Sequence, residues 1–436
     1  MPRNSSMFLG IAFSLSLFTA CSASSTGAGN GGSGGSGNSG AQGGGGQGAG
    51  DVGGFGGPGG NGGGGTTNPS CVSPAGEDND GDGYSEDQGD CNDCDKSSNP
   101  GAVEVINTTP DMNGNLPPVA DEDCDGTADN PVEFCDEGIA LDSPDAFMGA
   151  RAIDLCQQAT AGDGKWGVLE AAYVRANGVG APNPLQWGIK PGFGSNVKAQ
   201  RGKSLLAISA GYARDAGDAE GCGSTTCQTN YGGTAPPGFP AAVPGCEGDT
   251  AINDDVALQL KIRAPSNATG YSFNFKFYSF EFPEWVCTAY NDQFIALVNP
   301  PPVGAPTGNI SFDSKNNPVS VNIAFFDVCD PASASDWAAN CFFGSCPPLP
   351  NPYCASGTAE LVGTGFLEWD TFGYAGGTSW LKTQAPVNPG QEIMIRFAIW
   401  DTGDDALDST ALIDNFQWIA TGGTVNVGTE VIPEPK

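Results

Sequence analysis

Apolar residues alternate with polar ones along much of the second half of the chain, and this period of two constrains the fold more than any other feature. The alternation is clear in four stretches: Val256 to Ile262, Phe273 to Phe277, Val319 to Phe325 and Ile393 to Ile399. It turns one face of a strand toward a core. Since Gly, Pro and Asn separate the stretches, we expect antiparallel strands joined by loops. The predicted fold is mainly β, an antiparallel β-sandwich of jelly-roll type.

Two local features are expected around this pattern. An apolar stripe over Asp145 to Ala159 predicts one helix. In one predicted strand the phenylalanines move from odd to even positions: Phe273, Phe275, Phe277, Phe280 and Phe282. This slip predicts a β-bulge near Tyr278 and Ser279, beyond which Glu281 would lie on the outward face near a sheet rim.

The first residues predict export. An apolar run, Met7 to Phe18, follows a positively charged start and is too short to span a bilayer comfortably. The next residues complete Phe18-Thr19-Ala20-Cys21, which resembles a lipobox. The resemblance implies a lipoprotein signal over residues 1–21, with lipid on Cys21 as the membrane anchor. Ser22 then favours the outer membrane, with the folded part extracytoplasmic and surface-exposed. An ordinary signal peptide with an incidental cysteine is the alternative.

Composition divides the rest of the chain. Residues 22–70 are a Gly-rich linker in which 24 of the first 44 residues are glycine, and we expect it to be disordered. Residues 71–136, called the acidic module below, follow it. Residues 137–425, called the sandwich domain, carry the alternating pattern, and residues 426–436 form a C-terminal tail.

The cysteines favour disulfides. The chain has 15, and lipidation of Cys21 would leave an even 14, which an exported protein most often pairs. Their connectivity cannot be read from the sequence. Cys91 and Cys94 form a CxxC motif, which elsewhere holds metals, but the chain has no histidine and no helical pattern follows the motif. We therefore expect disulfides there too.

Charge and composition exclude several classes of function. Without histidine there is no Ser-His-Asp triad, no Cys-His pair and no His-ligated zinc or iron site. A net charge of −33 argues against nucleic-acid binding. Cys71 to Glu137 contain 19 acidic residues and one basic residue. Such density in a folded segment needs cations to relieve the repulsion.

One run in the acidic module has the spacing of a calcium loop. Acidic residues occupy positions 1, 3 and 5, and Gly83 at position 6 permits the left-handed backbone that turns the chain around an ion. The predicted ligands are Asp78, Asp80, Asp82, the Tyr84 carbonyl, Asp87 and Asp90. Position 12 is Gly89, and the flanks lack helical periodicity, so the loop is not an EF-hand. A solvated acidic loop is the alternative.

Later runs of the module carry a resemblance. They are Asp93-Cys94-Asp95, Pro100-Gly101-Ala102-Val103-Glu104 and Asp121-Glu122-Asp123-Cys124-Asp125-Gly126. Together with the loop they resemble a bacterial metal-binding Asp/Cys repeat, which is associated with copper in one lineage. Oxygen ligands suit calcium better. Departures at Asn92 and in the spacer Asn107 to Pro118 leave the second half of the metal site open. By analogy with thrombospondin-type repeats, we expect calcium to replace a hydrophobic core.

A second set of carboxylates follows predicted strand ends in the sandwich domain. It comprises Glu281, Asp292, Asp401, Asp404 and Asp408. Few basic residues lie nearby in sequence, so these acids would repel one another in a folded state. We predict that they form an oxygen cage for calcium. Solvated rim acids in turns are the alternative. Asp414, among apolar neighbours, needs a partner or an ion.

Several runs of the sandwich domain carry a second resemblance. They are Leu205 to Gly211, Phe275 to Trp285, Tyr290 to Phe294, Gly377 to Leu381, Pro389-Gly390, Ala398 to Asp404 and Asp408-Ser409. Over Glu137 to Thr424 the chain resembles the choice-of-anchor L family of bacterial surface domains. The resemblance implies a surface-displayed β domain attached by varied anchors. Cys287 and the insert from Cys329 to Cys354 depart from the family and are interpreted as disulfide-stapled loops.

These observations predict a non-catalytic, calcium-stabilised cell-surface lipoprotein with an adhesive or structural role in the envelope. Its partners would be the membrane, through the lipid, and a surface protein or glycan. A carbohydrate-binding module is the first alternative, and exposed aromatics would favour it; the candidates are Trp285, Trp337, Trp369 and Trp380. A glycoside hydrolase using Glu281 and Glu284 is the second, and it needs two carboxyls about 5–10 Å apart in a cleft.

Overall fold

The computed structural model describes residues 74–106, 110, 114–116, 119–130, 133–322, 325–340, 353–371 and 373–432. Three predicted features lie outside these residues: the signal peptide with Cys21, the Gly-rich linker and the end of the C-terminal tail. Within the described part of the chain, no helix is long and apolar enough to cross a membrane.

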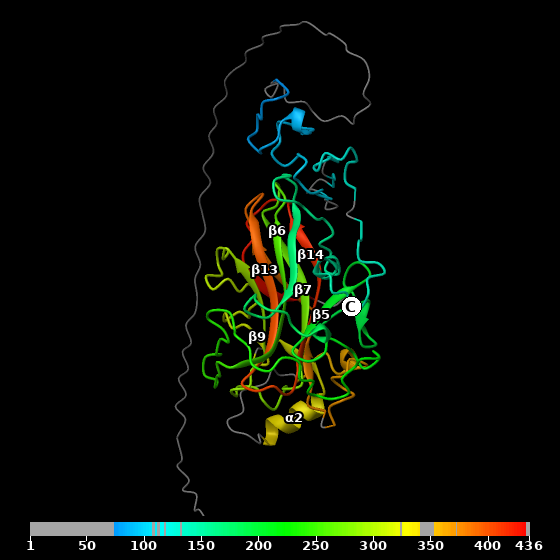
Figure 1. Cartoon of the computed structure of the whole chain (residues 1–436), viewed down its shortest axis with the longest axis vertical. Helices are drawn as coiled ribbons and strands as arrows, with labels where there is room; N and C mark the ends of the chain where they lie inside the picture. The colour runs from blue at the N-terminus through cyan, green and yellow to red at the C-terminus, as the bar shows by residue number, and fades with distance from the viewer. Residues whose placement is uncertain are drawn as a thin grey trace, which may run out of the picture. The chain divides into compact units, whose positions relative to one another are not determined.

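Two antiparallel sheets form the sandwich domain (Figure 1). The first has the order β1 (Gly167–Val174), β6 (Ile252–Arg263), β13 (Glu392–Thr402), β8 (Gln293–Asn299) and β9 (Val319–Ser320). The second has the order β10 (Phe326–Cys329), β11 (Gly376–Thr378), β7 (Gly270–Ser279), β14 (Ser409–Ile419), β5 (Leu205–Ser209) and β2 (Trp187–Lys190). Strand β12 (Leu381–Pro386) pairs with β7 and with β15 (Gly428–Val431).

The remaining elements are short. Strands β3 (Gly192–Phe193) and β4 (Val197–Lys198) pair with each other. The helices are α1 (Ala146–Arg151), α2 (Pro331–Asn340) and the 3-10 turns η1 (Glu86–Gln88), η2 (Pro184–Gln186) and η3 (Ala359–Leu361).

The main hydrophobic core includes the inward residues of both sheets. Phe273 of β7 packs edge-on against Phe397 of β13, with ring centroids 4.9 Å apart, and Phe275 lies 5.0 Å from Phe294 of β8. Each pair joins one sheet to the other. Burying such a ring contributes about 1.5–3 kcal/mol, which is why the apolar alternation holds along β6, β7 and β13. The predicted mainly β, antiparallel fold is confirmed, and the described strands form no closed barrel.

The strand predicted over Val319 to Phe325 is wrong in its length. Strand β9 ends at Ser320, the chain turns after it, and the next strand begins at Phe326. The reason is the partner strand: β9 pairs with the first residues of β8, Phe294 and Gln293, so the ladder ends where β8 begins. Val321 still packs into the core from the turn.

The predicted helix is also shorter than expected. Asp145 caps α1, because its carboxylate accepts a hydrogen bond of 3.0 Å from the Phe147 amide. The helix ends at Arg151, and the chain then leaves helical geometry at Asp154, whose φ is +72°. Apolar residues beyond this point extend the stripe in the sequence without continuing the helix.

The predicted β-bulge near Tyr278 and Ser279 is wrong. Register between β7 and β14 is regular there, and β7 ends at Ser279. The chain then turns, with the Glu281 amide donating to the Ser279 hydroxyl. Phe280 stacks on Phe366 in one cluster, while Phe282 stacks on Phe326 in the main core. The odd-to-even slip therefore marks a strand end, and Glu281 is buried instead of facing outward.

The described part of the acidic module is built from turns, with η1 as its one helical element. It buries two apolar side chains, Ala102 and Val103. Hydrogen bonds join it to the sandwich domain: the Tyr84 hydroxyl donates to the Gly164 carbonyl at 2.8 Å, and the Trp166 indole donates to the Ala102 carbonyl at 2.9 Å.

Five disulfides join described cysteines, and they confirm that the chain is stabilised by disulfide pairing. The pairs are Cys91–Cys124, Cys135–Cys156, Cys222–Cys227, Cys246–Cys287 and Cys329–Cys354. Cys91 pairs with Cys124 and not with its CxxC neighbour Cys94, which is itself disulfide-bonded. The last pair closes the loop that the sequence marked as an insert.

Candidate cation sites

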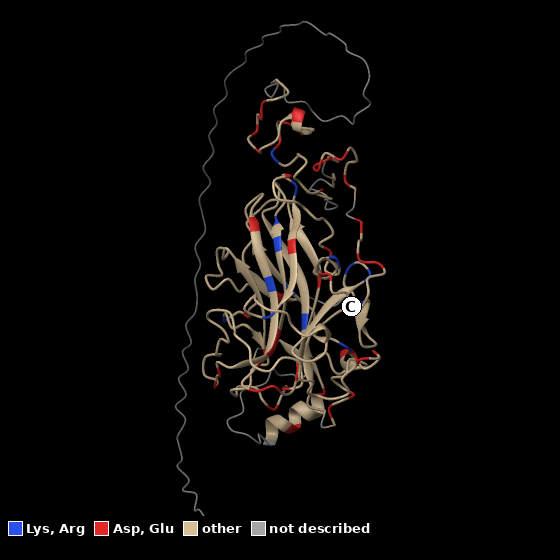
Figure 2. Cartoon of the chain, viewed as in Figure 1, with Lys and Arg blue, Asp and Glu red and all other residues tan. Residues whose placement is uncertain are grey.

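The first predicted calcium loop is closed by its own aspartates. Asp78 accepts hydrogen bonds from the amides of Gly81 (2.7 Å) and Gly83 (3.0 Å), and Asp80 accepts from the Asp82 amide at 3.1 Å. Gly83 has a φ of +102°, which a side chain would strain. These turns bring alternate carboxylates toward one side, as the spacing predicted. Acidic residues recur throughout the module (red in Figure 2).

Two sets of carboxylates gather around this loop, each with ligand oxygens within 4.8 Å of one another. They are Asp80, Asp82 and Asp90, and Asp78, Asp80 and Asp93. Asp90 is 5% exposed, and its Oδ2 finds no donor among the described residues. Burial, with the charges of Asp82, Asp80 and Asp93, raises the pKa of Asp90 to about 6. A divalent cation would relieve this cost.

Two predicted ligands stand apart from these sets, and one ligand candidate was missed. Asp87 is exposed and belongs to neither set. Tyr84 contributes its phenol to the contact with Gly164, and nothing in the geometry assigns a role to its carbonyl. Asp93, which the sequence did not single out as a ligand, is buried and accepts from the Asn79 amide at 2.9 Å.

A second loop repeats the first one. In the first loop the Gly83 amide bonds Asp78 and the Asn99 amide group bonds Asp82. In the second, the Gly126 amide donates to Asp121 at 3.0 Å, and the Asn130 amide group donates to Asp125 at 2.8 Å. Both loops read Asp-x-Asp-x-Asp-Gly, a signal that was present in the sequence.

The second loop also gathers carboxylates within 4.8 Å. The sets are Glu104, Asp121 and Asp123, and Glu104, Glu122 and Asp129. Glu104 belongs to both, and its Oε2 finds no donor among the described residues. Burial, with the charges of Asp123 and Glu122, raises the pKa of Glu104 to about 7. This is a second candidate cation site.

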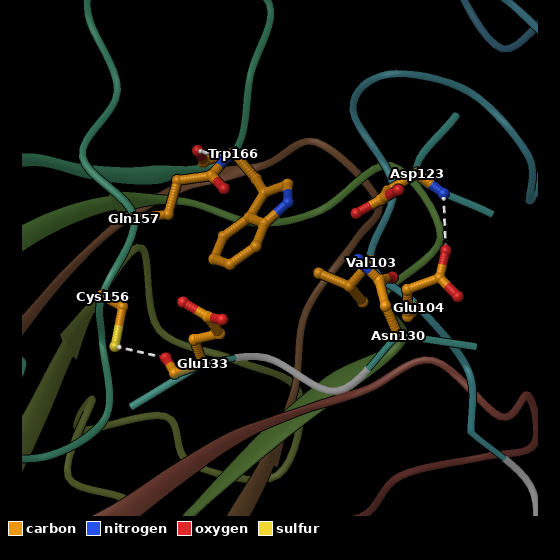
Figure 3. Close-up of a pocket in the computed structure, with 8 residues that line it drawn as sticks. All are labelled: Val103, Glu104, Asp123, Asn130, Glu133, Cys156, Gln157 and Trp166. Atoms are coloured by element: carbon orange, nitrogen blue, oxygen red, sulfur yellow. Dashed lines mark hydrogen bonds between the residues drawn. The ribbon is translucent and has the colours of Figure 1, made fainter. Parts of the chain in front are cut away.

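A cavity of about 350 Å³ adjoins the second loop (Figure 3). Its lining combines one aromatic ring with polar and acidic side chains: Val103, Glu104, Asp123, Asn130, Glu133, Cys156, Gln157 and Trp166. Its volume falls within the range of about 300–1,000 Å³ that is usual for small-ligand pockets.

In the sandwich domain, the structure buries four of the five predicted ligands. Glu281, Asp292, Asp401 and Asp408 are buried, and Asp404 is partly exposed. Asp292 accepts hydrogen bonds from the Thr402 amide (3.0 Å) and the Ser409 hydroxyl (2.6 Å), and its own amide donates to Glu281 at 3.3 Å. None of the four sets within 4.8 Å found among the described residues comes from this domain.

These buried acids raise one another's pKa values. Burial raises the pKa of Asp292 to about 7, and burial with the charges of Asp292, Asp408 and Asp254 raises the pKa of Asp401 well above its usual range. Burial, with the charges of Asp254 and Asp292, does the same for the pKa of Asp408. Asp254, on β6, is therefore a member that sequence reasoning missed.

The two alternative functions, a carbohydrate-binding module and a glycoside hydrolase, have specific structural requirements. None of the eight tryptophans, all of which lie in described segments, is exposed. Glu281 and Glu284, the acids considered for a hydrolase, are both largely withdrawn from solvent: burial raises the pKa of Glu284 to about 9 and that of Glu281 well above its usual range. Among the described residues there is thus no exposed tryptophan, and neither acid of this pair is exposed.

Comparison with known proteins supports one assignment. Residues 207–416 match the family model described as Choice-of-anchor L domain. The resemblance expected over Glu137 to Thr424 is thus confirmed for its central part, from β5 to β14. The family is a surface-anchoring domain family, not a known enzyme family, and it indicates an extracytoplasmic surface protein. Searches of curated proteins and of solved structures found no match.

Proposed function

We propose that this surface protein is a non-catalytic lipoprotein whose acidic module folds around calcium and which serves adhesion or envelope structure. The observation that carries the proposal is the gathering of carboxylate oxygens within 4.8 Å at both Asp-x-Asp-x-Asp-Gly loops. Six to eight oxygen ligands are what calcium takes in proteins, and waters and carbonyls supplement such carboxylates.

The composition of the module supports the same proposal. Two apolar side chains are buried in its described part, too few to offset the conformational entropy of ordering the chain. Bound calcium stabilises the folded form by mass action, by about 3 kcal/mol at a hundredfold excess over the dissociation constant. Calcium and disulfides together would take the place of a core.

The test is a calcium titration of the full chain, with matched aspartate variants. D80N removes a carboxylate shared by both sets of the first loop, while D87N removes an exposed carboxylate outside them. We expect D80N to weaken one calcium-binding event of the chain at least tenfold and D87N to leave every event unchanged. Equal affinities in both variants would show that the loop is a solvated acidic turn.

The lipid anchor rests on the sequence and is tested separately. C21S should move the protein from the membrane fraction to the soluble fraction of the producing cell, because the acceptor of the lipid is lost. C71S, a cysteine beyond the linker, is the control and should stay in the membrane fraction. Membrane association of C21S would rule out the anchor.

One observation favours the carbohydrate-binding alternative. It is the cavity beside the second loop, whose lining includes Trp166, Asn130, Gln157 and Glu133 (Figure 3). Rings and amides in one pocket suit a sugar. Binding of the full chain to a glycan array, lost in E133Q, would support this function. If no sugar binds above background at millimolar concentration, the carbohydrate-binding function is ruled out and the proposed adhesive or structural role stands alone.

A further inference from the structure

We propose that Asp254, Asp401 and Asp408 hold one calcium ion inside the sandwich domain. These residues lie outside the acidic module, so the site is independent of the loops on which the proposed function rests. It also revises the predicted cage of five acids, because Asp254 enters it while Glu281, Asp292 and Asp404 do not. Each of the three side chains is at least nine-tenths buried: Asp254 is 1% exposed, Asp401 0% and Asp408 4%.

Asp254 is turned inward by an irregularity in β6. The register between β13 and β6 passes from Ile399↔Val256 to Asp401↔Asn253, so β6 contains one extra residue there. Asp254 has a φ of +50°, a conformation that costs energy for a side-chain-bearing residue. Its Oδ1 accepts from the amide and hydroxyl of Thr229, at 2.8 and 2.9 Å. Its Oδ2 finds no donor among the described residues.

Asp408 is held in the same manner by the same segment of chain. Its Oδ2 accepts from the Cys227 amide at 2.8 Å, two residues before Thr229, and its Oδ1 finds no donor in the described part of the chain. The Asp408 carboxylate also packs directly against Gly211, where a Cβ atom would lie 1.8 Å from its Oδ2. One oxygen of each aspartate is therefore fixed, and the other is left over.

Asp401 completes the group from the neighbouring strand. It lies opposite Asn253 in the β13–β6 ladder, and the charges of Asp254 and Asp408 both act on it. Neither of its oxygens has a donor among the described residues, apart from Asp292, whose carboxyl could bond it only if one of the two were protonated. Both oxygens of Asp292 already accept hydrogen bonds, from the Thr402 amide and the Ser409 hydroxyl, so Asp292 is not assigned as a ligand.

The next residue along β6 shows what a compensated carboxylate looks like here. Asp255 is fully buried as well, but it accepts from the Arg175 guanidinium, with a Nε–Oδ1 distance of 2.9 Å, and from the Ala176 amide at 2.7 Å. Its neighbour Asp254 has backbone and hydroxyl donors to one oxygen alone. An uncompensated buried charge is strongly unfavourable. Three such carboxylates leave four oxygens with no donor, a hard oxygen set that suits calcium.

Calcium fits the group better than magnesium. Magnesium keeps several of its waters, which an enclosed site excludes, whereas calcium accepts irregular carboxylate geometry at 2.3–2.6 Å. The three carboxylates are not as close together as those of the module, so the ion would draw their free oxygens toward a common centre.

The experiment uses the full chain with D80N and E104Q already present, so that each of the four carboxylate sets of the module has lost a member. In this background, calcium retained after gel filtration is measured by mass spectrometry for the parent, D254N and D405N. Asp405 lies in the same loop as Asp408, between β13 and β14, and its carboxylate accepts from the Gln228 amide group at 2.6 Å. We expect one calcium per chain in the parent and in D405N, and none in D254N.

Thermal unfolding separates a ligand from a merely structural residue. D254N should unfold at an equal or higher temperature than the parent in chelator, since a buried repulsion is removed, yet gain nothing from calcium. The parent should gain several degrees. If D254N does not fold, the calcium retained by D408N is compared with that retained by the parent instead. A parent that retains no calcium, or a D254N variant that binds as much as D405N, would overturn the proposal without touching the module.

Discussion

The acidic module and the sandwich domain both concentrate carboxylates, and they accommodate them in opposite ways. In the module most of the acids lie on turns and are at least partly exposed, with Asp90, Asp93 and Asp136 buried, and few apolar side chains are buried among them. The sandwich domain has an extensive apolar core that fully buries Phe273 and Phe397, a smaller cluster that fully buries Trp400, and a small group of buried acids. The difference indicates where the folding free energy of each part comes from. Cross-links and cations dominate in the module, whereas burial of apolar surface dominates in the sandwich domain.

The largest contrast is expected from removing core side chains. F397A deletes a fully buried ring that packs on Phe273 across the two sheets, and it should lower the free energy of unfolding by about 3–5 kcal/mol. V103A deletes the larger of the two apolar side chains buried in the module, and it should cost about 1 kcal/mol. Urea unfolding followed by fluorescence and circular dichroism measures both. Equal costs would mean that the module has a core of its own.

Disulfide removal should disrupt the module more than the sandwich domain. C91A/C124A opens a loop with a sequence separation of 33 residues, which costs about 3–4 kcal/mol in the chain-entropy description. With no large core to compensate, the module should become sensitive to protease while the sandwich domain stays resistant. C135A/C156A, with a separation of 21 residues, costs a similar amount. In that variant the sandwich domain should nevertheless remain folded, because its core is intact. Limited proteolysis that cleaves both parts equally in either variant would contradict this.

How much the sequence could predict follows the same division. The strands β6, β7 and β13 were predictable, because their alternating residues pack directly between two sheets. Strand ends were not: Phe280 and Phe282 continue an apolar pattern past the end of β7 while entering different clusters. Periodicity records which residues are buried, and it does not record where the backbone turns.

The candidate cation sites were predictable to the extent that ligand spacing is local. The first loop follows from alternate aspartates and a glycine, and the same pattern at Asp121 to Gly126 was available to be read. Asp254 was not predictable, since it joins Asp401 and Asp408 through an extra residue in β6 and a hydrogen-bonded segment far away in sequence. Such a group exists only once the sheets have formed.

Whether the two loops of the module act separately gives the next effect. E104Q removes the carboxylate shared by both sets of the second loop, and D80N removes the one shared by both sets of the first. In a chain that also carries D254N, each should abolish one of the two calcium-binding events of the module in isothermal titration, and each should remove about 3 kcal/mol of stabilisation at a hundredfold excess of calcium. If either variant abolishes both events, the loops form one cooperative site. The contrast between module and sandwich domain would then be sharper, because the whole module would fold on a single equilibrium.

The smallest effect concerns a buried acid of the sandwich domain that has backbone partners in place of a cation. Asp414 is fully buried, and accepts hydrogen bonds from the amides of Gln200 and Asn415. Burial, with the charge of Asp154, raises its pKa from 3.8 to about 8. Between these two values the folded form holds a proton that the unfolded form has released. Its contribution to stability is therefore fully present below pH 4 and is lost as the pH rises toward 8, at no more than about 1.4 kcal/mol per pH unit.

D414N, which cannot titrate, should flatten the dependence of unfolding free energy on pH by up to one proton between pH 5 and 8, measured in chelator. D405N, on a partly exposed loop of the same domain, is the control. Identical slopes in wild type and D414N would mean that the backbone amides keep Asp414 ionised, and that the interior of the sandwich domain tolerates a bare carboxylate without either a proton or a cation.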